Sequence, residues 1–305
     1  MYAGIDIGYG YTKIAYHGKR YLFKTLVENY VPSDKGFNSE PDIITVNGRS
    51  YLVGPDASPT MEVTKDFVGT DDYFAVLGYS LGLIYKDTPD LKGIGLGLPP
   101  AMFNRRRVLK LKEQIRHLEI KNRNAYLPIP AKIEFIPQGV GAYIDYLSDH
   151  PEASESSIVV FDIGFYTMDV VHINKGQFNA GMSTSYPCGI EMMLKQISSE
   201  LTVRYGEFIG DSYAEEILKH GRIKHFGKEY SIDVSQIVND FYMPKLIKTI
   251  KEYSITLKDN KFTVDTVILT GGGAVYVKDL IEGVYVSKEP QFANARGYRY
   301  YVENK

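Results

Sequence analysis

The segment Ile5-Asp-Ile-Gly-Tyr-Gly-Tyr-Thr-Lys13 recurs in the middle of the chain as Phe161-Asp-Ile-Gly-Phe-Tyr-Thr-Met-Asp169. Each copy starts with apolar residues, reaches an Asp followed two residues later by Gly, and continues into a second apolar run. The pattern predicts a β-strand, a tight turn and a second β-strand, with a carboxylate at the turn that faces solvent or a ligand. Because glycine lets backbone N–H groups approach an anion closely, two such loops predict a duplicated domain that grips a phosphorylated ligand.

A third glycine-rich loop, Thr270-Gly-Gly-Gly-Ala274, follows an apolar run expected to be a buried strand. Any one of the three segments alone is typical of an ordinary turn. Their joint occurrence, in this order and each after an apolar strand, favours a nucleotide-binding site.

Length and composition set the class of protein. The chain has 305 residues, enough for two domains, with 44% hydrophobic and 24% charged residues, as in soluble globular proteins. The net charge of −2 gives no bulk attraction to nucleic acid or anionic membranes. A single cysteine, Cys188, cannot form an internal disulfide, and Asp6 interrupts the first apolar stretch. We therefore expect a cytoplasmic protein with no signal peptide and no membrane contact.

Strand patterns followed by helical patterns in both halves predict an α/β protein with two similar domains. A polar bridge at residues 151–157 is the best candidate boundary. Asn47-Gly48 between two apolar runs predicts a hairpin with a type I′ turn. Further strands are expected at residues 93–98, 132–136, 158–163, 167–173, 178–183 and 264–269. Helices are expected at residues 71–86, 104–118, 139–147, 190–201 and 212–221, and at 235–253 with a kink at Pro244.

The loops have the chemistry that a nucleoside triphosphate and its metal require. Asp6 and Asp162, at matching turns, are the expected Mg²⁺ carboxylates, acting through water. Lys13 supplies a mobile positive charge beside phosphate oxygens. The backbone is expected to contribute N–H donors around Gly8, Gly10 and Gly164, and a close approach to adenosine and the α-phosphate at Gly271, Gly272 and Gly273.

The order of motifs is similar to that of the actin, Hsp70 and sugar-kinase superfamily. The five family motifs would be residues 5–13, 136–143, 161–169, 269–275 and 293–301. Within that family, the chain resembles the ParM-type actin-like ATPases of bacteria and archaea. The likeness rests on Gly95-Leu-Gly-Leu-Pro99 with the basic helix after it, on Glu134-Phe-Ile-Pro-Gln-Gly139, and on Gln291-Phe-Ala-Asn-Ala-Arg-Gly297.

The resemblance implies the actin-like ATPase fold, with two RNase H-like domains flanking a nucleotide cleft. Domain I would comprise residues 1–150 together with a returning helix at 291–305, and domain II residues 151–290. Glu134 would orient or deprotonate the attacking water, with Gln138 as the competing candidate and Asp162 as the metal-side catalytic carboxylate. Gly189 and Glu191 would approach the ribose, and Glu216 and Lys219 the adenine.

Two positions depart from the family pattern. Tyr9 stands where relatives have Gly or a small hydroxyl residue, and Phe165-Tyr166 replaces a small Gly/Thr pair. Backbone donors survive these changes, so Tyr9 and Phe165 remain expected nucleotide contacts. Hydroxyl contacts would come only from Thr12 or Thr167.

Three functions are compatible with these motifs. The first is a filament-forming ATPase or GTPase that segregates plasmid DNA through a small DNA-binding adaptor, without contacting DNA itself, because Arg105-Arg106-Arg107 reads as a solvated helix face. The second is a small-molecule kinase of the same fold, and the third is a non-polymerising regulatory ATPase. The Glu-x-x-Pro-Gln segment favours the first.

Overall fold

The computed structural model describes residues 1–31, 41–58, 66–206 and 210–305. The chain forms two compact units. Unit 1 consists of Met1–Ser154 together with Ser287–Lys305, and unit 2 of Glu155–Val286. Each unit is built around its own sheet of mixed parallel and antiparallel strands.

The main sheet of unit 1 has the order β10-β7-β1-β2-β3. Strands β1, β2 and β3 are consecutive antiparallel neighbours, whereas β7 and β10 join β1 in parallel. Parallel strands are usually covered on both faces of their sheet, and β7 is accordingly buried along its whole length. The strands are β1 (Tyr2–Ile7), β2 (Tyr11–Tyr16), β3 (Lys19–Lys24), β7 (Gly93–Leu98) and β10 (Lys132–Pro137).

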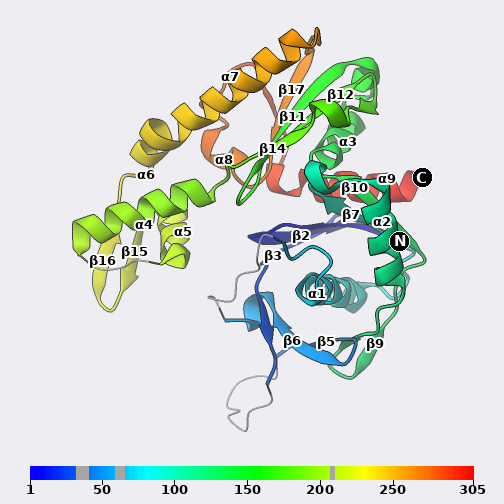
Figure 1. The fold of residues 1–305 in the computed structure, drawn as a ribbon. Helices are drawn as coiled ribbons and strands as arrows, with labels where there is room; N and C mark the ends of the chain where they lie inside the picture. The colour runs from blue at the N-terminus through cyan, green and yellow to red at the C-terminus, as the bar shows by residue number, and fades with distance from the viewer. Residues whose placement is uncertain (32–40, 59–65, 207–209) are drawn as a thin grey trace. The chain divides into compact units, whose positions relative to one another are not determined.

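A second, antiparallel sheet of unit 1 has the order β4-β6-β5-β8-β9. The expected Asn47-Gly48 turn is confirmed, with φ of 48° and 84°, and joins β5 (Ile44–Val46) to β6 (Arg49–Val53). Helix α1 (Asp71–Asp87) lies between the two sheets (Figure 1) and is buried over most of its surface. The remaining strands are β4 (Val27–Asn29), β8 (Ile120–Asn122) and β9 (Ala125–Leu127).

Helix α9 (Ala293–Asn304) returns to unit 1 from the far end of the chain and packs on β1, β7 and α3 (Val140–Asp149). It lies on the opposite face of the main sheet from α1 (Figure 1). The approach is close, because a Cβ on Gly297 would overlap the carbonyl oxygen of Gly141 in α3. Helix α2 (Arg105–Arg116) begins after Asn104, whose side chain accepts a hydrogen bond from the backbone N–H of Arg107.

The sheet of unit 2 has the order β13-β12-β11-β17-β18, with β14 also paired to β12. As in unit 1, an antiparallel hairpin is extended by parallel strands. The strand expected at 178–183 is instead a two-residue strand and a 3₁₀ turn (Ala180–Met182) before β14. The strands are β11 (Ser157–Ile163), β12 (Met168–Asn174), β13 (Gln177–Phe178), β14 (Thr184–Tyr186), β17 (Thr266–Thr270) and β18 (Tyr285–Val286).

Helices of unit 2 cover this sheet and build a smaller lobe. Helix α4 (Glu191–Tyr205) packs on α5 (Asp211–His220), and the hairpin β15 (Arg222–His225) and β16 (Lys228–Ser231) follows α5 directly (Figure 1). The long helix expected at 235–253 consists of a short α6 (Val234–Gln236), a π-helix (Ile237–Tyr242) and α7 (Met243–Asp259). Pro244 stands in the first turn of α7, where its missing N–H needs no partner, and the widened π turn precedes it.

Among the described residues, no helix is both long enough and apolar enough to cross a bilayer. The expected α/β class is confirmed by these sheets and helices.

A histidine in the core of unit 2 makes stability depend on pH. His172 on β12 is fully buried and lies 3.1 Å from the Ser157 hydroxyl and 3.3 Å from the Asn179 amide. Burial lowers the pKa of the imidazole, so the unfolded chain binds this proton more readily than the folded one. Unfolding midpoints in urea should therefore fall as the pH drops below about 6.5, the unperturbed pKa of histidine. His172→Asn should flatten this dependence, whereas the same change at the exposed His117 should leave it as in the wild type.

Candidate functional site

The two repeated segments fold into hairpins of the same register. Asp6 pairs with Lys13 across β1 and β2, and Asp162 pairs with Asp169 across β11 and β12. Both turns close in the same way: the N–H of Gly8 donates to the carbonyl of Tyr11 at 3.2 Å. The N–H of Gly164 likewise donates to the carbonyl of Thr167 at 2.8 Å. The N–H groups of these two glycines therefore serve the turns themselves.

Asp6 is the centre of the polar cluster in unit 1. Its side chain is almost fully buried, and its two carboxylate oxygens accept from different residues. Lys13 Nζ donates to Oδ2 at 3.1 Å, and Gln138 Nε2 donates to Oδ1 at 3.2 Å. The structure thus brings together three of the predicted site residues, from β1, β2 and the start of α3.

Gln138 is held in place by helix α9. The side-chain oxygen of Asn294, on α9, accepts from the N–H groups of Gly139 and Ala142 at 3.0 and 3.1 Å. These contacts cap the first turn of α3, immediately after Gln138. Gln138 also donates its own N–H to the carbonyl of Leu98 at 2.7 Å. The amide side chain that reaches Asp6 is therefore carried by a fixed segment.

Glu134 lies on β10, four residues before Gln138. It stands level with Gly95 and Gly4 in the sheet, two residues short of Asp6. Its Oε2 accepts from both Lys112 and Lys305 at 2.9 Å. Burial alone would raise the pKa of Glu134, but the two ammonium groups outweigh it and hold the pKa below its usual value. The carboxylate is thus an ion-pair partner, and the structure brings Gln138 rather than Glu134 to Asp6.

Other residues of the first loop are distributed between the loop and the core. The Thr12 hydroxyl lies 2.9 Å from that of Thr25, and both threonines are buried. The Tyr9 ring packs on Phe67, with ring centroids 5.4 Å apart. The carbonyl of Gly10 accepts from the N–H of Thr25 at 3.0 Å. The Thr12 side chain is therefore occupied within the core.

In unit 2, the triple-glycine loop lies directly against the second hairpin. Gly271 has φ of +87°, which favours glycine, and a Cβ there would overlap the carboxylate of Asp162. The N–H of Gly273 donates to the carbonyl of Ile163 at 2.9 Å. Gly272 completes the loop beside Ile190, the residue before α4. The structure therefore joins the predicted adenosine loop to the predicted metal-side carboxylate.

The start of α4 is fixed on the second hairpin loop. The N–H groups of Gly189 and Glu191 donate to the carbonyls of Tyr166 and Phe165 at 3.3 and 2.9 Å. The Glu191 side chain pairs with Lys195 at 2.7 Å. Within the loop, the Thr167 hydroxyl donates to Asp169 at 3.4 Å. The predicted ribose residues thus lie beside the predicted phosphate loop.

Helix α5 contributes a charged cluster near the triple-glycine loop. Lys219 Nζ lies 2.8 Å from Glu215 and 3.9 Å from the half-exposed Glu216. Burial raises the pKa of Tyr276 on α8 (Ala274–Val277), with smaller opposing effects of Lys219 and Glu215. Lys219 and Glu215 thus act electrostatically on the helix that follows Gly271–Gly273. Glu216 points to the solvent side of the cluster.

Three residues that sequence reasoning did not assign belong to these clusters. Asp169, buried opposite Asp162, gives unit 2 a second carboxylate where unit 1 has Lys13. The sequence could have indicated Asp169, because Lys13 and Asp169 each stand seven residues after the aspartate of their own hairpin. Asn294 caps α3. Tyr73 is fully buried, with no hydrogen-bond partner for its hydroxyl among the described residues, and burial together with nearby Asp6 raises its pKa.

No group of three or more His, Cys, Asp and Glu side chains in the described ranges is arranged to hold a metal ion.

Comparison with known proteins identifies a related domain in each half of the chain. Residues 4–141 match the family model for the N-terminal domain of actin-like proteins, and residues 160–283 match that for the C-terminal domain of the archaeal actin homologue MreB-like proteins. No curated protein sequence matches the chain.

Solved structures of the same fold cover nearly the whole chain. Ta0583, an archaeal actin homologue, superposes with a TM-score of 0.83 at 24% identity, covering 99% of both chains. Its complex with ADP gives 0.82 at 22% identity, covering 100% of this chain and 99% of that one. A ParM subunit from a 15-stranded filament of Clostridium botulinum gives 0.71 at 21%, with coverage of 100% and 99%. The resemblance and the actin-like fold are confirmed, and the chain belongs to the actin-like proteins, with an actin-like N-terminal and an MreB-like C-terminal domain.

Proposed function

We propose that this protein is a nucleotide-dependent polymerising actin-like ATPase, with ATP or GTP and Mg²⁺ as its cofactors. The observation that carries the proposal is the pair of register-matched hairpins, with Asp6 in one and Asp162 in the other. Two further findings support it: an archaeal actin homologue of this fold binds ADP, and a ParM of this fold forms filaments. Domain I would comprise residues 1–150 and 291–305, and domain II residues 151–290.

In unit 1, the proposed role of the cluster is to hold phosphate oxygens and the attacking water. Lys13, fixed by Asp6, offers its remaining N–H donors to the phosphates. Gln138 donates a hydrogen bond to the same carboxylate, and its amide would also bind the attacking water. An amide can orient a water but does not abstract its proton. Phosphoryl transfer depends mainly on such positioning and on charge stabilisation. Backbone donors at Tyr9 and Gly10 would add to the cradle.

In unit 2, the proposed role of the cluster is to hold the cation and the nucleoside. Asp162 and Asp169 are cross-strand neighbours on the same face of the hairpin, so the pair offers two carboxylates to one cation. The cation would neutralise charge on the phosphates. The ribose and adenine would contact the surface of Gly189, Glu191, Glu216 and Lys219 around the loop Gly271–Gly273.

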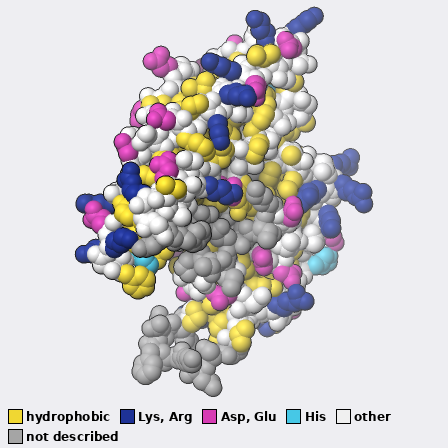
Figure 2. All heavy atoms as spheres, turned by 60° about the vertical axis from the view of Figure 1, so that its left-hand side comes forward, with side chains coloured by type: hydrophobic (Ala, Val, Ile, Leu, Met, Phe, Trp, Pro, Cys, Tyr) yellow, Lys and Arg dark blue, Asp and Glu magenta, His cyan; other side chains and the backbone are white. Residues whose placement is uncertain are grey.

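The cellular role that we propose is plasmid or other DNA segregation in the cytoplasm. Filament growth would move the cargo, and a small DNA-binding adaptor would make the DNA contact. The distribution of charge supports this division of labour. Lys and Arg side chains are interspersed with Asp and Glu on the face shown in Figure 2, and the net charge is −2.

Light scattering with pelleting tests the proposal. Adding Mg-ATP or Mg-GTP to the wild type should cause scattering that decays as phosphate is released, whereas Mg-ADP should not. Asp162→Ala should abolish this response, because it removes the carboxylate that lies against the loop Gly271–Gly273. Asp259→Ala, at an exposed position near the end of α7, is the matched control and should assemble normally.

Two results would contradict the proposal. Turnover stimulated by a sugar or another metabolite, without assembly at any concentration, would assign the protein to the kinases of this fold. If the protein neither assembled nor hydrolysed nucleotide, it would be a non-polymerising regulatory protein, and the segregation role would be rejected.

A further inference from the structure

Phe226, at the tip of the β15–β16 hairpin, is 95% exposed. It occupies the first position of a two-residue turn, with φ of +45°, and Gly227 follows with φ of +78°. These are the angles of a type I′ turn, which favours Asn, Asp or Gly at that position. A bulky aromatic residue there strains the backbone and gains almost no burial within its own unit.

Other hairpins of the chain use the same turn without an apolar residue. His17-Gly18, Asn47-Gly48 and Lys175-Gly176 all have two successive positive φ angles. Their first residues are polar. Phe226 is therefore the exception among these turns, and an exposed, backbone-strained residue of this kind is a reason to look for a binding role.

The ring of Phe226 contacts a second aromatic ring. Its centroid lies 4.3 Å from that of His225, edge to face, and His225 lies 4.7 Å from Tyr213 of α5. The Tyr213 hydroxyl is 3.1 Å from His225 Nδ1. The three rings lie in contact in sequence and form a projection, which we call the aromatic tip (Tyr213, His225 and Phe226).

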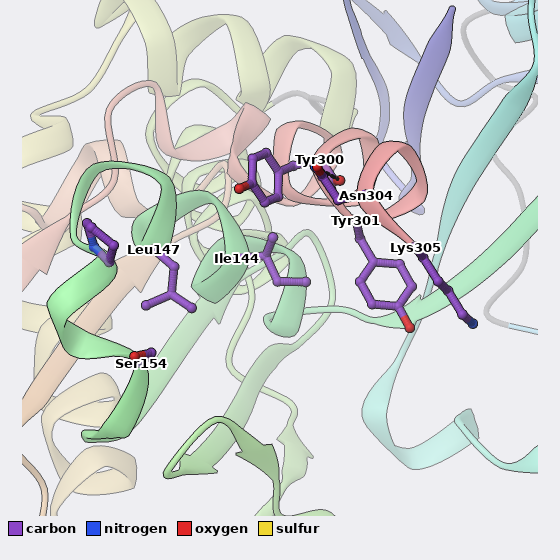
Figure 3. Close-up of a pocket in the computed structure, with 8 residues that line it drawn as sticks. Ile144, Leu147, Ser154, Tyr300, Tyr301, Asn304 and Lys305 are labelled. Atoms are coloured by element: carbon purple, nitrogen blue, oxygen red, sulfur yellow. Dashed lines mark hydrogen bonds between the residues drawn. The ribbon is translucent and has the colours of Figure 1, made fainter.

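Unit 1 has an apolar pocket that no described side chain fills. It has a volume of about 530 Å³ and lies between α3 and α9 (Figure 3). Ile144 and Leu147 line it from α3, and Tyr300 and Tyr301 from α9. Pro151, after α3, also lines it. Pockets of this size and composition are typical of sites that receive an apolar group.

The exposed charge around the tip is mainly positive, and an exposed carboxylate, Glu152, lies at the rim of the pocket. Three exposed cations, Arg222, Lys224 and Lys228, flank the aromatic tip, against one carboxylate, Glu229. At the pocket, exposed Glu152 follows Pro151 and contacts His150 at 3.3 Å, and Asp149 pairs with Lys288. Lys305, which also lines the pocket, is already paired with Glu134. Opposite charges at the rim of an interface speed association and set its orientation.

We propose that the aromatic tip of one copy inserts Phe226 into the α3–α9 pocket of a second copy. The inference rests on the proposed polymerising function and names the contact that would carry it. Tip and pocket are different surfaces of the same chain, so the contact is heterologous and repeats from copy to copy. Such a contact builds an open filament when the rotation between copies does not close a ring.

A single buried Phe covers about 150–250 Å², whereas a stable interface needs about 1,000 Å² or more. Phe226 therefore acts as the anchor of a larger contact. Removing such an anchor commonly weakens binding more than tenfold.

The first test removes the anchor without harming the turn. Phe226→Asn places the preferred residue at this position, so the melting temperature should be unchanged or higher. The critical concentration for nucleotide-dependent assembly should rise at least tenfold. Lys175→Asn makes the same change in the equivalent turn of the β12–β13 hairpin and should assemble as the wild type does. Assembly of Phe226→Asn at the wild-type critical concentration would overturn the proposal.

A crosslinking test does not require filaments. Phe226→Cys in one copy and Tyr300→Cys in a second copy of different mass should be joined by a short bismaleimide. The native Cys188 is buried and should not react. Lys175→Cys mixed with Tyr300→Cys is the control and should give no product. Absence of the Phe226–Tyr300 product would contradict the pairing.

The two tests separate this contact from the proposed function. Crosslinking without assembly of the wild type would reject the polymerising ATPase and retain the contact between copies. Assembly of the wild type, with no crosslink and no effect of Phe226→Asn, would retain the function and reject this contact. Failure of both tests would reject both.

Discussion

Replacing Gln138 with Ala should slow phosphate release by about 10²-fold while leaving nucleotide binding close to that of the wild type. The expected size is that of a group which positions a reactant. Gln138 is the uncharged donor on Asp6, and Asn294 fixes the helix start that carries it. Single-turnover phosphate release and equilibrium binding of a labelled nucleotide would measure the two quantities separately.

Glu134→Gln is the matched comparison. The amide keeps the shape of the side chain but removes the charge paired with Lys112 and Lys305. Because these ammonium groups already hold the pKa of Glu134 low, the carboxylate is a weak base, and turnover should change less than about threefold. A large loss in Glu134→Gln with near-normal turnover in Gln138→Ala would reverse the assignment and restore Glu134 as the residue that acts on water.

Gly297→Ala should destabilise unit 1 by about 3 kcal/mol, at the upper end of the range for overpacking. The added methyl would overlap the backbone carbonyl of Gly141, and a backbone atom cannot move aside as a flexible side chain can. Helices α3 and α9 would have to separate, which would also disturb the Asn294 cap behind Gln138. The expected result is a lower urea midpoint together with weaker nucleotide binding.

Gly181→Ala provides the control, because its nearest neighbour would be the Asn179 side chain at 3.6 Å, an ordinary contact. Its stability should stay within about 0.5 kcal/mol of the wild type. If both variants unfolded at the same urea concentration, the close packing of α3 and α9 would not be a determinant of stability.

Local patterns were sufficient to predict the main elements of the fold. The repeated Asp-x-Gly segments predicted both hairpins, because a turn and its two strands depend on neighbouring residues. Asn47-Gly48 predicted its own turn for the same reason. The β15–β16 hairpin was missed, since its short strands are rich in Lys and Arg and its turn begins with Phe226 rather than Asn.

The site was harder to predict where it depends on distant residues. Whether Glu134 or Gln138 reaches Asp6 is decided by the register of β10 on β7 and of β7 on β1, which no local pattern encodes. The cap on α3 comes from Asn294, 155 residues further along the chain. Thr12 was expected at the nucleotide, but its hydroxyl turns to Thr25 because that side of β2 faces the core.

The return of α9 to unit 1 has a consequence for synthesis. Unit 2 is a continuous segment, whereas unit 1 is completed only when residues 293–304 join β1 and β7. A nascent chain therefore carries an uncovered apolar sheet face on the ribosome while the whole of unit 2 is being made. Domains generally fold as units during translation, so the part encoded second can be finished first. The yield of native protein would then depend on how well a chaperone protects that sheet, or on how soon α9 is translated.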